Sequence, residues 1–265
     1  MGIFANPLTD LLEYEDFSRD FLKGTDPVGM TGCIDSEKVH FISTFLGEKK
    51  VQLVVTYNEQ RAREIEEDYK LFCSQVYVIP PRDLIFFSAD LQGNAIIAER
   101  MKAFAALYQN EAKVIITTMD ALMSAAVPFE QLMSHVIKLK EGDELDLEKL
   151  KHDLTVMGYE RVGRVEEPGQ FTVHGGIADV YPLTMEVPVR IELWGDEIDT
   201  IRCFEPQSQR SMDQIECVSV FPAAEVIADD TARRRAVGMI QNELESQLAV
   251  FKKAKEPDKA KRLRE

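Results

Sequence analysis

The sequence predicts an α/β protein with two unlike parts, and three observations carry this prediction. Up to about residue 125, β-branched runs alternate with amphipathic stretches of about 10–15 residues, the pattern of a parallel sheet covered by helices on both faces. From residue 135 onward, short Val- and Ile-rich runs separated by glycine and proline predict an antiparallel sheet. At 265 residues the chain is long enough for two domains.

The first part is predicted to alternate helices with strands. Apolar residues recur at helical spacing in four stretches, 8–23, 36–46, 59–72 and 95–108. Short runs rich in β-branched residues predict four strands, 28–31, 51–56, 76–79 and 114–118. This order indicates a doubly covered parallel sheet in which 28–31 is the first strand.

The second part is predicted to be an inserted α+β domain. Its expected strands are 135–139, 161–165, 171–174, 177–181, 189–194 and 198–204, and its one expected helix is 147–157. Gly195-Asp196 is the expected hairpin turn between the last two strands. We expect the run 218–221 to rejoin the first sheet.

These elements divide the chain into three segments. Residues 1–128 form the first lobe, and residues 129–206 form the insertion. Residues 207–265 return to the first lobe and end in a charged helical segment. Because no glycine or proline closes that segment, we expect it to continue beyond residue 265.

A degenerate phosphate-binding loop opens the helix of the first lobe. Gly29 and Ser36 hold the first and last positions of the outline G-x-x-x-x-G-K-[ST], with Gly32 between them, but Ile34 stands where the second glycine belongs, and Asp35 replaces the lysine. That lysine reaches the β- and γ-phosphates, which a carboxylate repels. The loop therefore predicts a RecA-like lobe by descent that binds no nucleotide and needs no cofactor. The sequence also lacks an acidic D-E-x-H or D-E-A-D box, so we expect no ATP hydrolysis from this segment.

Composition disfavours several classes of function. The net charge of −15 argues against a whole surface that binds DNA or anionic lipid. The four cysteines have no metal-ligand spacing, and no apolar run reaches the ~18 residues of a membrane span. We expect a cytoplasmic protein without a metal site. Seven basic residues crowd the C-terminus, and they are Lys252, Lys253, Lys255, Lys259, Lys261, Arg262 and Arg264. They indicate a solvated helix end, with direct DNA binding as the alternative.

The stretch 158–183 combines aromatic and cationic residues on a small predicted sheet. Tyr159, Arg161, Phe171 and His174 have the composition of an interface anchor. The alternative for the two aromatic residues is that they belong to the core. Arginines are rarely buried without a partner, so Arg161 and Arg164 are expected to be exposed or ion-paired.

The same stretch, together with 188–202 and 204–211, resembles the N-terminal module of the bacterial transcription-repair coupling factors. That module is itself similar to the excinuclease protein UvrB. The runs 83–87, 96–101 and 118–123 match the early part of the module, so the resemblance covers nearly the whole chain. UvrB keeps an intact phosphate loop and carries a tyrosine-rich hairpin, whereas residues 79–94 are too few for that hairpin and contain no tyrosine.

The resemblance implies that the inserted domain docks on the excinuclease protein UvrA. In the full-length proteins, later domains bind RNA polymerase and move along double-stranded DNA with ATP. Arg161 matches one family arginine, and Phe171-Thr172-Val173-His174 replaces the Phe-Arg-Val-Arg of UvrB. The predicted UvrA-binding residues are therefore Arg161, Phe171 and His174, with Arg164 as a compensating cation. An ATP-dependent repair helicase component that resembles UvrB and binds damaged DNA is the alternative.

Overall fold

The structure is a computed structural model that describes residues 8, 14–25, 27–46, 51–82, 91–227 and 230–253. The side chains of residues 91–94, 230–233 and 252–253 are outside this description. The family-like run 83–87 and most of the basic C-terminal cluster also lie outside the described residues. The same holds for much of the stretch 79–94.

The first lobe is built on a three-stranded parallel sheet. Its strands are β1 (Gln52–Thr56), β2 (Val76–Ile79) and β3 (Val114–Thr118), in the order β1-β3-β2. Every residue of β3 is buried, because both faces of this central strand are covered. Val114 and Ile116 pack with α4 (Glu59–Lys70) and α3 (Asp35–Ser43), while Ile115 packs with alanines of α5 (Leu91–Tyr108). The predicted α/β layer arrangement is confirmed.

The expected strand at 28–31 is wrong. Residues 27–31 pair with no strand in the part of the chain that the structure describes, and Val28 is exposed. A short apolar run has strand propensity but becomes a strand only where a neighbouring strand pairs with it. The preceding α2 (Tyr14–Lys23) instead packs its aromatic residues against Phe41 and Phe45 of α3 and its C-terminal turn.

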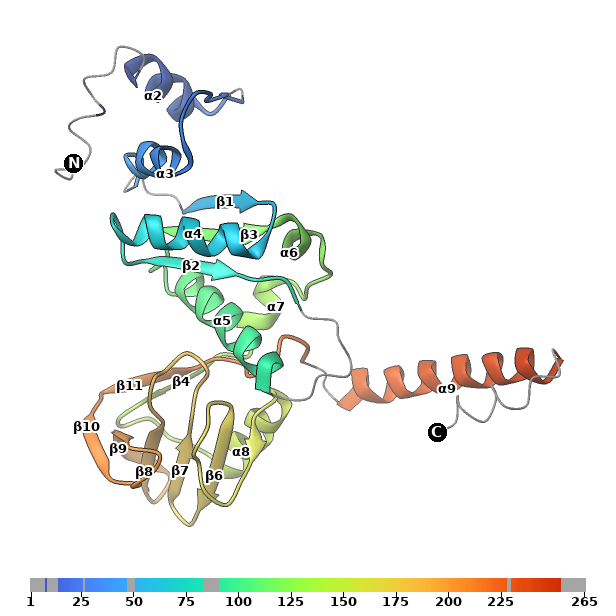
Figure 1. Cartoon of the computed structure of the whole chain (residues 1–265). Helices are drawn as coiled ribbons and strands as arrows, with labels where there is room; N and C mark the ends of the chain where they lie inside the picture. Colours follow the sequence, from blue (N-terminus) through green and yellow to red (C-terminus); the bar gives the residue numbers. More distant parts are fainter. Residues whose placement is uncertain are drawn as a thin grey trace.

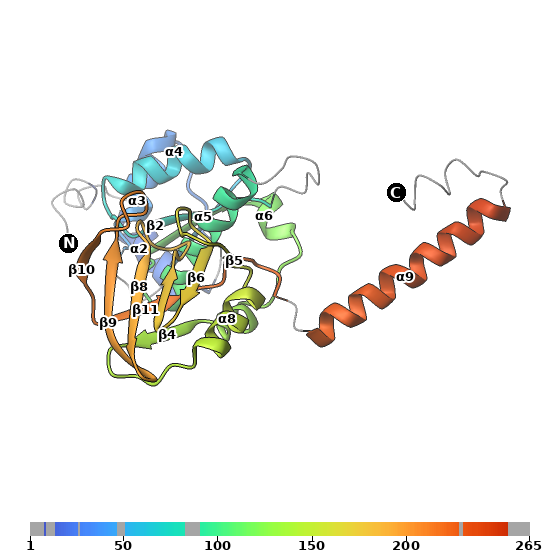
Figure 2. The same cartoon turned by 90° about the horizontal axis from the view of Figure 1, so that it is seen from below.

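The second domain contains a six-stranded sheet and a two-stranded sheet. The larger sheet has the order β10-β9-β8-β7-β6-β5, and its strands are β5 (Glu160–Arg161), β6 (Gln170–His174), β7 (Ile177–Val180), β8 (Val189–Trp194), β9 (Glu197–Phe204) and β10 (Ser211–Gln214). The smaller sheet pairs β4 (Ile137–Lys140) with β11 (Cys217–Val220). Helix α8 (Leu147–Val156) packs Leu150 and Leu154 into the core that these strands share (Figure 2).

The β8–β9 hairpin forms as predicted. Trp194 pairs with Glu197, which leaves Gly195 and Asp196 as a two-residue turn, and Gly195 has a φ of 67°. The left-handed conformation at the first turn position favours glycine, because a Cβ atom would clash with the backbone there.

Two expectations for the second domain are wrong. The strand predicted at 161–165 ends at Arg161, because Val165 turns away to pack with Tyr181 and Phe204 in a separate cluster. The strand near 218–221 does not rejoin the first sheet, since β11 pairs antiparallel with β4. The return to the first lobe therefore begins at Phe221, which packs against Met101 of α5, and not at residue 207.

The two parts meet at α5 and at the chain that follows β11 (Figure 1). Glu225, which is buried, accepts hydrogen bonds from Arg82 and from Arg100 of α5. The Tyr159 hydroxyl donates to the Phe221 carbonyl at 2.7 Å. These polar contacts fix how the second domain leaves and re-enters the first lobe.

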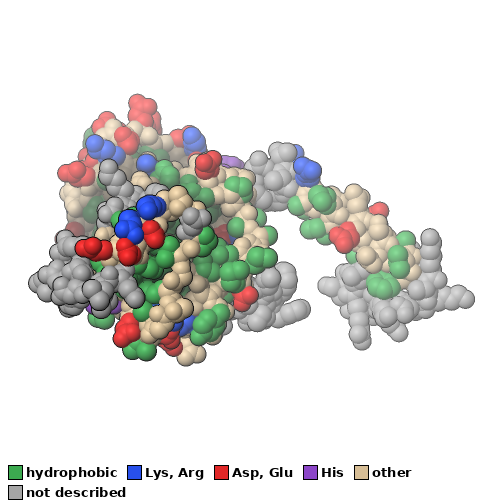
Figure 3. Space-filling model, turned by 90° about the horizontal axis from the view of Figure 1, so that it is seen from above, with side chains coloured by type: hydrophobic (Ala, Val, Ile, Leu, Met, Phe, Trp, Pro, Cys, Tyr) green, Lys and Arg blue, Asp and Glu red, His purple; other side chains and the backbone are tan. Residues whose placement is uncertain are grey.

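Three further helices complete the described chain. They are α6 (Met119–Met123), α7 (Phe129–Met133) and α9 (Asp230–Lys253). Helix α9 extends away from the rest of the molecule, and hydrophobic side chains such as Val237 and Ile240 are exposed along it (Figure 3). In the described residues, no helix is both long and apolar enough to span a bilayer.

Candidate protein-interaction surface

The six-stranded sheet has one covered face and one polar face. Phe171 and Val173 of β6 point into the core beside α8, so the alternate residues of the same strands lie on the opposite face. Strand register aligns four polar residues in one row across that face, and they are Thr172, Asp179, Arg190 and Arg202. We call this the outer face.

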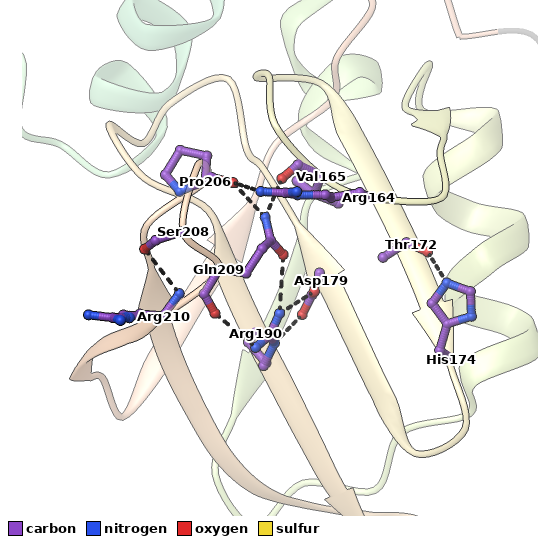
Figure 4. Close-up of polar contacts among 10 residues, drawn as sticks. All are labelled: Arg164, Val165, Thr172, His174, Asp179, Arg190, Pro206, Ser208, Gln209 and Arg210. Atoms are coloured by element: carbon purple, nitrogen blue, oxygen red, sulfur yellow. Dashed lines mark hydrogen bonds and ion pairs between the residues drawn. The ribbon is translucent and has the colours of Figure 1, made fainter.

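An ion pair stabilises the middle of the outer face. Arg190 donates from Nε to Asp179 Oδ1 and from Nη2 to Asp179 Oδ2, both at 2.8 Å, which is a bidentate pair (Figure 4). The guanidinium also lies 4.7 Å from the ring centroid of Phe204. The hydrogen bond with Asp179 raises the pKa of Arg190, so the side chain is a fixed cation.

A loop after β9 folds over one end of the outer face. Gln209, with a φ of 60°, donates through Nε2 to the carbonyls of Val165 and Pro206, at 3.1 and 2.6 Å. Arg164 donates to the Gln207 carbonyl and lies 3.2 Å from Glu166 Oε1. It also donates to the Pro206 carbonyl at 3.5 Å (Figure 4). The half-exposed side chain of Arg164 is therefore held by its own loop.

The four predicted binding residues do not form one cluster. Arg161 is exposed on the edge strand β5, and no hydrogen bond or ion pair joins its side chain to other described residues. Its register with Phe171 puts it on the side of the sheet that α8 covers, at the open edge. His174 is exposed on the outer face, where Nε2 lies 2.9 Å from the Thr172 hydroxyl.

Phe171 was predicted to contact UvrA, but the structure places it in the core. Its side chain is 0% exposed and packs in the core of the second domain, so it cannot touch a partner while the domain is folded. Tyr159 is also buried, at 3% exposure. The core alternative was right for both aromatic residues, because their strand and helix-end positions face α8.

Asp179 and Arg190 were not among the residues predicted for this surface. Their signal was present, since each is a charged residue inside an apolar strand. What the sequence could not give is the register that places the two side chains opposite each other across β7 and β8.

The degenerate loop leads directly into α3, which begins at Asp35. Asp35 Oδ1 lies 3.1 Å from Lys38 Nζ and 3.6 Å from Arg61 Nη2. The hydrogen bond from Lys38, followed by the charge of Arg61, lowers the pKa of Asp35. Ile34 N–H donates to Glu37 Oε2 at 3.0 Å, so the helix N-terminus that would meet a phosphate carries two carboxylates.

Gly29, Gly32 and Ser36 are exposed around this N-terminus, and Gly32 has a φ of 86°. The described residues contain no group of three or more His, Cys, Asp or Glu side chains that could hold a metal ion.

Comparison with known proteins gives a family match for the second domain. Residues 137–225 match the family described as the UvrB interaction domain, and this range runs from β4 to the buried Glu225. The chain is also 34% identical over 231 residues to the transcription-repair-coupling factor of Staphylococcus haemolyticus, covering 86% of this chain and 19% of that protein.

This chain is similar to one segment of the transcription-repair-coupling factors. The relative from Staphylococcus epidermidis is 31% identical over 246 residues, and that from Bacillus subtilis is 29% identical over 259 residues. The matches cover 92% and 96% of this chain, and 20% and 22% of the respective relatives. The chain thus spans about a fifth of the length of these curated relatives.

Proposed function

We propose that this chain is a non-catalytic, cytoplasmic recruitment module whose second domain binds the excinuclease protein UvrA. The observation that carries the proposal is the match of residues 137–225 to the UvrB interaction domain. The matched range contains every strand of the six-stranded and the two-stranded sheet, so one folded unit corresponds to one interaction domain.

The contact is assigned to exposed cations at the β5 edge and on the outer face. Arg161 has the free, exposed guanidinium that an acidic partner would meet, and Arg164 lies nearby in the following turn. His174 stands where UvrB has an arginine, and its imidazole lacks the fork of five donors that a guanidinium presents. Phe171 supports the contact indirectly by filling the core beneath β6.

The first lobe serves in this proposal as a scaffold with a degenerate, RecA-like ancestry. Its helix N-terminus is already neutralised by Asp35 and Glu37, which leaves no favourable site for a phosphate. The proposal keeps the order of first lobe, inserted domain and return to the first lobe. The return now begins at Phe221 instead of residue 207. In the longer protein, RNA polymerase and double-stranded DNA are the further proposed partners.

Calorimetry with purified UvrA tests the proposed contact. Loss of an interface anchor costs on the order of 2 kcal/mol, so Arg161→Ala should weaken binding roughly 30-fold. Arg19→Ala, which removes an exposed arginine from α2, is the matched control and should bind like the wild type. The variant His174→Arg should tighten binding, because it restores the family's cation.

The outcomes separate the residue from the function. If Arg161→Ala is folded and binds UvrA with wild-type affinity, the assignment of Arg161 is wrong. If the unaltered chain does not bind UvrA, the recruitment proposal itself fails.

A nucleotide-binding assay tests the helicase alternative. Titration with labelled ATP and Mg²⁺ should show no saturation in the micromolar range. Saturable binding that Asp35→Ala changes would favour the alternative and would contradict the scaffold role of the first lobe.

A further inference from the structure

A groove runs along β4, and none of the residues assigned to UvrA lines it. A cavity of about 700 Å³ is bounded by β4, the start of α8 and the β8–β9 turn. A second cavity of about 340 Å³ shares Ile137, Lys149 and Asp153 with the first. The two cavities together form one trough between the strand and the helix, which we call the β4 groove.

One edge of β4 is open to this groove. In the part of the chain that the structure describes, β4 pairs with β11 alone. Glu141 N–H donates to the Glu216 carbonyl directly opposite, so the alternate residues Leu139 and Ile137 also direct their backbone groups toward β11. The N–H and C=O of Lys138 therefore face the other edge, where a further strand would bind.

The lining of the groove combines apolar side chains with negative charge. Ile137, Leu145 and Leu193 are partly buried apolar residues that pack against the core and remain accessible in the groove. The lining holds five carboxylates against two lysines. The Lys138 ammonium is directed to the ring of Tyr108, 5.1 Å from its centroid. The excess of negative charge at Glu144, Asp153 and Asp196 selects a cationic occupant.

We propose that the β4 groove binds an extended peptide of alternating cationic and apolar residues, which adds as a strand to the free edge of β4. Main-chain hydrogen bonds to Lys138 would provide affinity, and alternate side chains would provide specificity. Apolar side chains of the peptide would cover the apolar lining, while its cations would pair with the carboxylates at the rim. This site is separate from the UvrA contact and does not depend on it.

A second copy of this chain is a poorer occupant. Pairing two β4 edges would bring two sets of groove carboxylates together, and like charges at an interface are unfavourable. The chain as a whole also carries a net charge of −15, so a basic peptide is attracted over a longer range than another copy.

Fluorescence anisotropy with a labelled peptide amide, Lys-Val-Lys-Val-Lys-Val, tests the site on the full chain. The peptide should bind saturably, and a peptide with glutamate in place of lysine should not. The double variant Glu144→Gln/Asp196→Asn should weaken binding roughly tenfold, because two close charge pairs are lost. Asp213→Asn, which removes a carboxylate from the exposed strand β10, is the control and should change affinity less than twofold.

N-methylated peptides test strand addition without altering the protein. Alternate amides of an extended peptide point to opposite edges, so methylating the odd or the even residues blocks one edge only. One isomer should lose binding and the other should retain it. Equal binding by both isomers, equal binding by the glutamate peptide, or absence of saturation would overturn the proposal. Arg161→Ala should leave peptide binding unchanged, which separates this site from the UvrA contact.

Discussion

The buried carboxylate of Glu225 is expected to be a main determinant of how the two parts of the chain are joined. Glu225 is 7% exposed and Arg100 is 3% exposed. Arg82 Nε donates to Glu225 Oε2 at 2.8 Å, and Arg100 Nη2 donates to the same oxygen at 3.2 Å. Replacing Glu225 by glutamine keeps the shape of the side chain but leaves the Arg100 cation buried without a counter-charge.

The size of the effect follows from this geometry. Removing one partner of a buried ion pair costs about 3–5 kcal/mol, because the remaining charge has lost its water without compensation. For a protein of this size, each kcal/mol lowers the melting temperature by about 2–4 °C, so Glu225→Gln should lose roughly 10 °C. That loss is a large part of a typical stability of about 5–15 kcal/mol.

Thermal and urea unfolding followed by circular dichroism measure this loss. The matched control is Glu186→Gln, because Glu186 also links the second domain to α5 through Lys102, at 3.0 Å, but is 89% exposed. Exposed pairs contribute about 0–1 kcal/mol, so the control should unfold like the wild type. A loss below about 1 kcal/mol in Glu225→Gln would show that the buried Arg100 cation does not need this carboxylate.

A double variant separates the buried charge from simple loss of contacts. Glu225→Met combined with Arg100→Met removes both the carboxylate and the deeply buried cation. Apolar replacement of a complete buried pair is often neutral, so the double variant should be more stable than Glu225→Gln. The half-buried Arg82 can turn toward water in this variant.

Two substitutions and one thiol-labelling experiment test the second domain. Gly158→Ala should lower the free energy of unfolding by on the order of 2 kcal/mol in urea titrations. Gly158 has a φ of 92°, and an added Cβ would lie 2.6 Å from the Cβ of Ala224. Wild-type stability of this variant would contradict the expected strain. Tyr159→Phe should cost about 1–2 kcal/mol in the same titrations, since it leaves the buried Phe221 carbonyl without its donor, and a neutral effect would mean that another donor replaces it. With Ellman's reagent at pH 8, Cys217 should react before Cys203, because burial raises the pKa of the Cys203 thiol and so lowers its thiolate fraction. The reverse order would contradict the burial of Cys203.

Local patterns in the sequence were sufficient for most of the elements. The strands β2, β3 and β8 coincide with the predicted ranges, and the β8–β9 turn falls at Gly195-Asp196. These features depend on residue propensity, on hydrophobic periodicity and on turn chemistry, all of which act over a few neighbouring residues. The acidic replacement at Asp35 was likewise readable from the loop outline alone.

The candidate site was only partly readable from the sequence. Arg161 and Arg164 were expected to be exposed or ion-paired; both are exposed, and Arg164 also lies 3.2 Å from Glu166 Oε1. The sequence could not tell whether Phe171 lies in the core or at the interface, because an aromatic residue suits either environment. It also could not pair Asp179 with Arg190, since that contact depends on strand register.

Residue patterns alone therefore predicted the order and type of most elements, and they placed a carboxylate, Asp35, at the start of α3. Three features depended on tertiary contacts: among the described residues 28–31 has no partner strand, β11 pairs with β4, and Phe221 packs against the first lobe. Local sequence patterns could not predict these features, because strand pairing and burial depend on partners far away in the chain. The residues of β11 lie about 80 positions from those of β4, and no short window of sequence contains both.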